Sequence, residues 1–459
     1  MKPTRKDQQS KKTETYKGVL ELLLVIGAIL LIPLFFAVRT AANSQPASPT
    51  QTITAPITAS ASEESATVKV QRPPACTFPL AQISTKESQP EEYTFSEPKV
   101  VLTGTEGNIY TIAEWLPDNQ HVLITEQLRN VVLGNDTNSQ ENISLYNPET
   151  GELKLYAIRS LTNSAPPSWL PELNAVVYPV MNFYDIDRKA LTYKVNHQIW
   201  ISYGDPNTAQ VLEDNLSQLS VAFKPGGGET LYLSDKKIFK LDKLLKNLPS
   251  ISFNSAEWDY AKEWRNDKPV SYIMAWQPGT SLVFLYSEDA MQAGGYTFIL
   301  NASTGDVCEL HLGGWAKVAR WSSDGRYLAI KRATSFNETD LTLLNIVTGE
   351  LTTLGGMPEG IEGQFHVYDF IWAPDNHHLL AIGDIISSQT DQGKDVVEGL
   401  YLIDSISGQS IHVAPESKSF TFSQDNNFAW SPDGSKLVIH CPVQTVDQIC
   451  LISVQRVGQ

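Results

Sequence analysis

Two charged residues stand directly before aromatic residues of a recurring motif and are the first candidates for a binding site. Glu114 precedes Trp115, and Arg320 precedes Trp321. If both lie on strands that line a channel, their opposite charges could bind a small ligand. The alternative is that both side chains only form a solvated lining.

A second candidate is the aromatic cluster in the longest insertion, residues 240–269. Trp258, Tyr260 and Trp264 lie beside Arg265 in a segment that predicts a short helix. Because aromatic and Arg side chains are enriched at interaction hot spots, this cluster predicts a surface for a protein partner. The alternative is that the aromatic side chains pack locally onto the fold.

The cysteines point to one local disulfide. Two strands are predicted near 436–441 and 448–454, and placing Cys441 opposite Cys450 sets Ile439 opposite Ile452 and Leu437 opposite Val454. The alternation of a strand then puts both cysteines on one apolar face. We therefore predict a Cys441–Cys450 disulfide.

The chain has four cysteines, so a second disulfide follows only by elimination. Four cysteines allow three pairings, and removing the first pair leaves Cys76 and Cys308. The sequence thus offers Cys76–Cys308 as its second disulfide.

The sequence lacks the motifs of common hydrolases. It contains neither a G-x-S-x-G nucleophile elbow nor an H-E-x-x-H zinc motif. His377 and His378 adjoin in a predicted turn and are interpreted as exposed loop histidines, while Asp185 and Asp187 are interpreted as a solvated turn rather than a cation site. We predict no catalytic residue, no metal and no cofactor.

Charge and hydropathy divide the chain. The net charge of −16 argues against a nucleic-acid partner. Residues 1–16 are basic and predict a cytoplasmic tail, 17–39 are apolar and predict a transmembrane signal-anchor helix, and the rest is predicted to lie outside the cytoplasm. A cleaved signal peptide is the alternative. Residues 40–95, rich in Ser, Thr, Pro and Ala, predict a disordered stalk and linker.

The remaining residues, 96–459, are repetitive. Seven aromatic anchors recur at intervals of 45 to 58 residues, each followed by an apolar strand: Trp115, Trp169, Phe223, Trp276, Trp321, Trp372 and Trp430. Four short antiparallel strands per repeat predict an all-β, seven-bladed β-propeller, with six or eight blades as alternatives. The last repeat lacks an outer strand, so residues 99–103 are predicted to complete it and close the ring.

The runs WSPDGSKLVI (430–439), WSSDGRYLAI (321–330) and WAPDNHHLLAI (372–382) resemble the WD-repeat-like units of TolB-type and dipeptidyl-peptidase-like propellers. Glu172, Gly226 and Gly279 depart from the pattern by replacing its aspartate. The motif itself is interpreted as structural, with Trp between blades and Asp tying the turn. The resemblance implies a fold and not the role of TolB.

The function predicted from the sequence is a membrane-anchored extracytoplasmic propeller that binds a protein or an envelope ligand without catalysis. Two alternatives stay open. One is a hydrolase or lyase with its site at the channel mouth, and the other is an ectodomain that senses envelope ligands.

Overall fold

The computed structural model describes residues 69–71 and 91–457, except for stretches between strands, of which 129–139, 252–269 and 415–427 are the longest. The chain divides into the units 1–64 and 65–459, and every described residue belongs to the second. Among these residues no helix is long and apolar enough to cross a membrane. The predicted tail 1–16 and anchor 17–39 lie outside the described residues.

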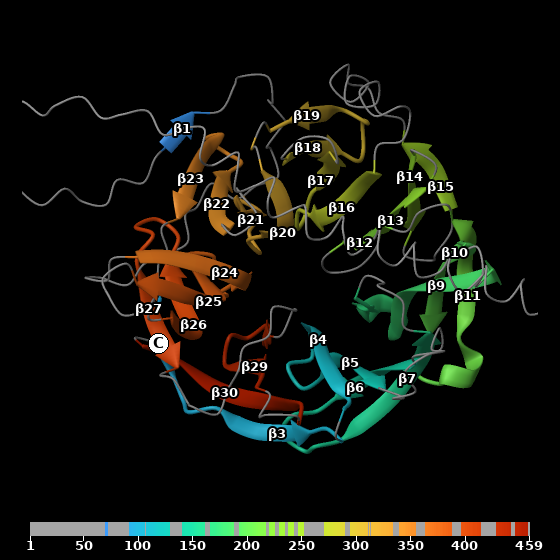
Figure 1. Ribbon diagram of the computed structural model, residues 1–459, viewed down its shortest axis with the longest axis horizontal. Coiled ribbons are helices and arrows are strands. Elements are labelled where there is room, and N and C mark those ends of the chain that lie inside the picture. The colour runs from blue at the N-terminus through green and yellow to red at the C-terminus, as the bar shows by residue number, and fades with distance from the viewer. Residues whose placement is uncertain are drawn as a thin grey trace, which may run out of the picture. The chain divides into compact units, whose positions relative to one another are not determined.

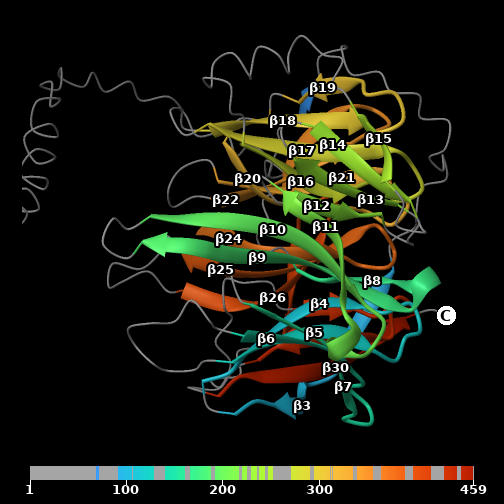
Figure 2. The ribbon, with the colours of Figure 1, turned by 90° about the vertical axis from the view of Figure 1, so that its right-hand side faces the viewer.

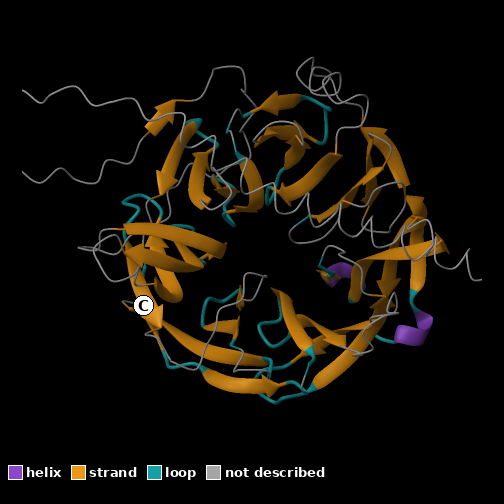
Figure 3. Cartoon of the chain, viewed as in Figure 1, coloured by secondary structure: helices purple, strands orange, loops and turns teal. Residues whose placement is uncertain are grey.

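The described chain is almost entirely antiparallel sheet, and its only helices are the 3₁₀ turns η1 (Pro171–Leu173) and η2 (Pro206–Thr208) (Figure 3). Six sheets use consecutive strands. The first three comprise β4 (Ile109–Trp115), β5 (Val122–Leu128), β6 (Gln140–Tyr146) and β7 (Leu153–Ser160); β8 (Ser168–Leu170), β9 (Ala175–Asp187), β10 (Thr192–Ser202) and β11 (Gln210–Leu216); and β12 (Ser220–Phe223), β13 (Glu229–Ser234), β14 (Lys237–Asp242) and β15 (Asn247–Ile251).

The next three sheets follow the same order along the chain. They comprise β16 (Val270–Trp276), β17 (Leu282–Asp289), β18 (Gly294–Asn301) and β19 (Val307–Glu309); β20 (Trp315–Trp321), β21 (Tyr327–Ala333), β22 (Thr339–Asn345) and β23 (Glu350–Leu354); and β24 (Gly363–Trp372), β25 (His378–Ser387), β26 (Val396–Asp404) and β27 (Ser410–Ala414). A seventh sheet joins the two ends of the described chain through β28 (Phe428–Trp430), β29 (Lys436–His440) and β30 (Gln448–Val457) with β2 (Glu92–Phe95) and β3 (Lys99–Thr103).

The sheets stand around a ring with their first strands toward the centre (Figure 1), and each first strand carries one of the seven aromatic anchors. Buried apolar side chains fill the space between neighbouring sheets: Leu341 and Leu343 of one sheet pack with Phe365 and Tyr401 of the next. The β-propeller predicted from the repeats is therefore confirmed. In the side view (Figure 2), the β9–β10 hairpin extends past the strands next to it.

The ring closes by pairing strands from both ends of the propeller. β3 pairs antiparallel with the first half of β30, from Lys99 opposite Leu451 to Thr103 opposite Gln448. This confirms the predicted role of residues 99–103. A second strand, β2, pairs with the far half of β30, with Phe95 opposite Val454.

The stalk prediction for 40–95 is wrong at two places, because β1 (Lys69–Gln71) and β2 are strands. β1 adds to the outer edge of β23, with Val70 opposite Leu351. Both strands are short, with one apolar residue in β1 and two, Tyr93 and Phe95, in β2, so their pairing depends on edges that β23 and β30 offer only in the folded ring.

The four turns that keep the aspartate have the interpreted structural role. The Asp433 carboxylate accepts a hydrogen bond from the Ser435 N–H at 3.0 Å, and Gly434 has φ of 75°. Asn119 and Asn376 occupy the same left-handed position in their turns, at φ of 58° and 57°. Their side chains also reach the turn of the preceding sheet.

These asparagines link neighbouring turns around the ring. The Asn376 Oδ1 accepts a hydrogen bond from the Ser323 N–H at 2.6 Å, and the Asn119 Oδ1 accepts one from the Asp433 N–H at 2.9 Å. The second bond joins the first repeat to the last. The turns therefore close the ring alongside the strand pairing.

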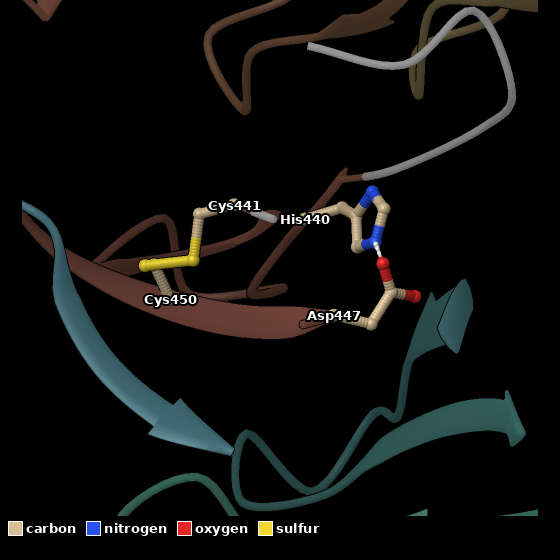
Figure 4. The surroundings of a disulfide bond; sticks show 4 residues. All are labelled: His440, Cys441, Asp447 and Cys450. Atoms are coloured by element: carbon tan, nitrogen blue, oxygen red, sulfur yellow. Dashed lines mark ion pairs between the residues drawn. A yellow bond between two sulfur atoms is a disulfide. The ribbon is translucent and has the colours of Figure 1, made fainter. Parts of the chain in front are cut away.

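Cys441 and Cys450 form a disulfide with their Cα atoms 5.9 Å apart (Figure 4). The predicted register is wrong by two residues, because Ile439 lies opposite Cys450 and Leu437 opposite Ile452. A shift of two keeps every side chain on its face, so the cysteines still meet, diagonally across the hairpin. Cys308 is also disulfide-bonded, and its predicted partner Cys76 lies outside the described residues.

Candidate functional site

Glu114 bridges two neighbouring inner strands. Its Oε1 accepts hydrogen bonds from the Trp169 N–H at 2.5 Å and the Ser168 hydroxyl at 3.1 Å, both on β8. Burial raises the pKa of Glu114 above its ordinary value, and these two hydrogen bonds oppose the rise. The carboxylate is thus engaged in joining β4 to β8.

Arg320 makes the equivalent bridge elsewhere in the ring. Its Nη2 lies 3.1 Å from Oδ2 and 3.2 Å from Oδ1 of Asp369, a buried residue on β24. Its carbonyl accepts a hydrogen bond from the Trp372 Nε1 at 2.9 Å. β20 neighbours β16 and β24, whereas β4 neighbours β28 and β8. The structure therefore does not bring Glu114 and Arg320 together.

Two neighbouring inner strands are interrupted by β-bulges beside Arg320. On β20 the register shifts between Ala316 and Val318, and on β24 it shifts between Val367 and Asp369. The extra residues are Lys317 and Tyr368, each four positions before its Trp anchor. Bulges re-aim side chains and are over-represented next to active sites. The inner strands β4 and β16 also carry bulges, but these lie two positions before the anchor, at Ala113 and Met274.

Three cationic residues lie beside these bulges, Lys317 and Arg320 on β20 and Lys331 on β21, and Arg320 contacts the buried Asp369 of β24. Lys317 is exposed and has no hydrogen-bond or ion-pair partner among the described residues. Lys331, on β21, donates from Nζ to the Tyr368 carbonyl at 2.5 Å, across to the neighbouring sheet. We call Lys317, Arg320 and Lys331, together with Asp369, the cationic cluster.

The charges of the cluster influence one another. Burial lowers the pKa of Lys331 below its ordinary value, Asp369 opposes this, and Lys317 adds to it by repulsion. The register agrees with this, because Lys317 directly precedes Val318, which lies opposite Lys331 in the pairing of β20 with β21. Like charges are costly to hold together without an anion between them, so the arrangement favours binding of a negatively charged group.

The adjacent histidines belong to a different, buried cluster, and the prediction that they are exposed is wrong. His378 Nδ1 lies 2.6 Å from Asp375 Oδ2, and His377 Nε2 lies 3.2 Å from Asp404 Oδ2. His377 is the last residue of the turn and His378 is the first residue of β25, and their ring centroids lie 5.2 Å apart. The Tyr93 ring on β2 contacts His378 edge-on.

Hydrogen bonds in this turn set the charge of its aspartate. Burial alone would raise the pKa of Asp375, but the His378 side chain and the His377 and His378 N–H groups bond to it and hold the pKa below its ordinary value. Asp375 Oδ2 also accepts the Glu91 N–H at 3.2 Å. This cluster fastens the chain just before β2 to the neighbouring sheet.

A further His–Asp pair lies where the closing hairpin meets the first sheet. His440 Nε2 is 3.0 Å from Asp447 Oδ1 (Figure 4), and Asp447 Oδ2 accepts the Tyr110 N–H at 2.6 Å. Burial raises the pKa of Tyr110 to about 12, and the neighbouring Glu126 adds to the rise. The pair holds β29 and β30 against β4.

The other sequence candidates are not tested as binding sites by the structure. Trp258, Tyr260, Trp264 and Arg265 lie outside the described residues. The turn predicted for Asp185 and Asp187 is wrong, because both residues lie on strand β9, and their side chains are not described. Within the described part of the chain, no group of His, Cys, Asp and Glu is arranged to hold a metal ion.

Sequence reasoning found Arg320 but missed Lys317, Lys331 and Asp369. Lys317 and Asp369 lie on inner strands, as Arg320 does, but only a residue directly before an anchor was considered. Nothing in the sequence marks a β-bulge, so the position that re-aims Lys317 was not visible. The signal that could have found them is the excess of Lys and Arg in 317–332, within an acidic chain.

The chain matches no family model and no curated protein. Among solved structures it is similar to other β-propellers. Oligogalacturonate lyase from Vibrio parahaemolyticus matches with 11% identity over 80% of this chain and 98% of that chain, at a TM-score of 0.49. The propeller domain of the Trilobed protease from Pyrococcus furiosus matches with 11% identity over the same shares, at 0.45.

TolB from Acinetobacter baumannii matches with 14% identity over 68% of this chain and 67% of that chain, at a TM-score of 0.36. The matched proteins are thus TolB, a lyase and the propeller domain of a protease. At these identities and TM-scores the likeness extends to the fold and carries no argument about ligand or activity.

Proposed function

We propose that this protein is a membrane-anchored binding module whose propeller recognises a protein or envelope ligand outside the cytoplasm, without catalysis. Residues 17–39 form the anchor, and residues 1–16 face the cytoplasm. The disulfide between Cys441 and Cys450 suits an oxidising compartment. The apolar stretch behind a basic segment supports the orientation.

The observation that carries the proposal is the cationic cluster. Glu114 and Asp369 are engaged in bridges between inner strands, whereas Lys317 is exposed at a bulge and has no partner in the part of the chain that is described. A charged side chain that a rigid ring presents without a partner is available for a ligand. Because the surrounding bridges fix the strands, little ordering is needed on binding.

The test compares Lys317→Gln with Lys99→Gln, which removes the same charge from an exposed position on outer strand β3. Full-length protein is crosslinked in membranes, solubilised and purified with its bound molecules. We expect a ligand or partner that the wild type and Lys99→Gln retain and Lys317→Gln loses. Turnover of a peptide or glycan library by the wild type, abolished in Lys317→Gln, would replace the binding module by an enzyme.

The anchor is tested separately by alkaline extraction of membranes and by protease treatment of intact cells. An uncleaved anchor keeps the full-length chain in the membrane pellet at high pH. Protease added outside the cell, or outside the inner membrane, should degrade the propeller and leave residues 1–16 protected. Recovery of a soluble chain that begins after residue 39 would contradict the anchor.

A further inference from the structure

We propose that the cationic cluster is a subsite for a phosphate-class oxyanion carried by the ligand of the propeller. The inference rests on the proposed function, because it names the chemical group that the binding module recognises. The cluster lies on β20, β21 and β24, with β20 and β24 at the centre of the ring (Figure 1).

The charge of the cluster favours a doubly charged anion over a single carboxylate. Among the residues that the structure describes, Asp369 is the one acid that pairs with Arg320, and its Oδ1 also accepts the Phe370 N–H at 2.8 Å. Arg320, Lys317 and Lys331 therefore leave two positive charges uncompensated within the cluster. A phosphate ester carries close to two negative charges near neutral pH.

The donors of the cluster are divided between positioning and binding. Arg320 commits Nη2 to Asp369, and Lys331 commits one Nζ hydrogen to the Tyr368 carbonyl. Lys317 keeps all three of its ammonium hydrogens for a ligand, and Lys331 keeps two. We infer that Lys317 touches the oxyanion, while Asp369 acts as a positioning residue that fixes the guanidinium.

The negative net charge of the whole protein limits where an anion can bind. The chain carries a net charge of −16, so its average field repels anions. An anion is held only where local cations outnumber local acids at short range. This predicts weak, salt-sensitive binding of a free anion and stronger binding of a ligand that adds contacts elsewhere on the ring.

The experiment titrates full-length protein in a nonionic detergent with inorganic phosphate, and with acetate at matched ionic strength, by calorimetry. We expect phosphate to bind more tightly than acetate. Loss of one charge-assisted hydrogen bond in Lys317→Gln should weaken phosphate binding about tenfold. The control Lys99→Gln should stay within about twofold of the wild type, as a distant surface charge does.

A second arm separates the sources of the phosphate group. Glycerol 2-phosphate represents a soluble or polymer-borne phosphate ester, and vesicles of phosphatidylcholine with phosphatidylglycerol represent a lipid headgroup. If glycerol 2-phosphate displaces bound inorganic phosphate and the vesicles do not, the phosphate group belongs to a soluble or polymeric ligand. If only the vesicles displace bound inorganic phosphate, the phosphate group belongs to a lipid headgroup. Either result supports the shared chemistry.

Absence of phosphate binding, or equal weakening in Lys317→Gln and Lys99→Gln, overturns the subsite. Its failure is distinguishable from failure of the proposed function. If Lys317→Gln still retains the natural partner of the wild type in the crosslinking experiment, the protein remains a binding module and its ligand lies elsewhere. Asp369→Asn should weaken phosphate binding less than Lys317→Gln does, because Asp369 acts only through Arg320.

Discussion

Tyr93 offers a sharp test of how the ring closes. It precedes the first repeat and yet is buried against the last two sheets, with 7% of its surface exposed. Its ring contacts Trp430 with centroids 5.4 Å apart and His378 at 5.9 Å. If β2 closes the ring as the structure shows, Tyr93→Ala must destabilise sheets that are more than 280 residues away in the sequence.

The size of the effect follows from burial. An aromatic side chain buries about 150–250 Å², and at about 25 cal/mol per Å² this corresponds to about 4–6 kcal/mol. Aromatic-to-Ala substitutions in cores cost about 3–5 kcal/mol. We therefore expect Tyr93→Ala to lower the free energy of unfolding by about 4 kcal/mol. Tyr93→Phe should cost far less, because the hydroxyl makes one long bond to Glu91, at 3.3 Å.

The assay is urea unfolding of the full-length chain in detergent, followed by the fluorescence of its ten tryptophans, Trp430 among them. Tyr203→Ala is the matched control, because Tyr203 is 49% exposed and should cost less than about 1 kcal/mol. If Tyr93→Ala lowers the free energy of unfolding no more than Tyr203→Ala does, closure of the ring by β2 is refuted.

Three further predictions follow from other contacts. The pKa of Asp375 in the folded protein lies below its ordinary value, so the ionised carboxylate stabilises the fold at pH values above the ordinary pKa, and this stabilisation is lost as the pH falls through the folded pKa. The difference in unfolding free energy between wild type and Asp375→Asn should therefore shrink when stability is measured below about pH 4. Cys308 is disulfide-bonded and Cys441 and Cys450 bond to each other, so mass spectrometry of non-reduced digests should find Cys76 linked to Cys308, and a free thiol at Cys76 would contradict this. Gly434→Ala should lower the free energy of unfolding in urea more than Gly151→Ala does. Both replace a glycine at positive φ, but an added Cβ at Gly434 meets Arg456 and Pro374, whereas one at Gly151 meets nothing within 4 Å. Equal losses would show that the side chains beside Gly434 move away freely.

The fold could be predicted because its signal is local and repeated. Four of the repeats share the same turn chemistry, with an aspartate that accepts a hydrogen bond from the N–H group two residues ahead and a residue at positive φ directly after it. The closing role of 99–103 was also predictable, because the last repeat lacked one strand and one matching segment lay at the other end.

The register of the Cys441–Cys450 hairpin was not predictable from alternation alone. A shift of two residues preserves the faces, so the apolar pattern is satisfied by both registers. The observed register places Ile439 opposite Cys450, and the Cys441 N–H donates to the Gln448 carbonyl across the hairpin. β1 and β2 escaped prediction because strands of three and four residues form only against edges that are built elsewhere in the ring.

Some residues of the candidate site could likewise be predicted from the sequence, and others could not. Arg320 was identifiable because it stands before an anchor, but its partner Asp369 lies on the next sheet, 49 residues on. Likewise, His377 and His378 look like exposed loop residues until β2 and Asp404 enclose them.

The sequence alone determined the strands, the turns and the order of the sheets, because hydrophobic alternation and turn chemistry act between residues close in the chain. Only the tertiary structure decided which charges meet. That choice depends on bulges at Lys317 and Tyr368, which rotate side chains without leaving a compositional trace, and on contacts between neighbouring sheets. Charge pairing acts over a few ångströms in space, and the ring sets those distances through residues about 50 positions apart.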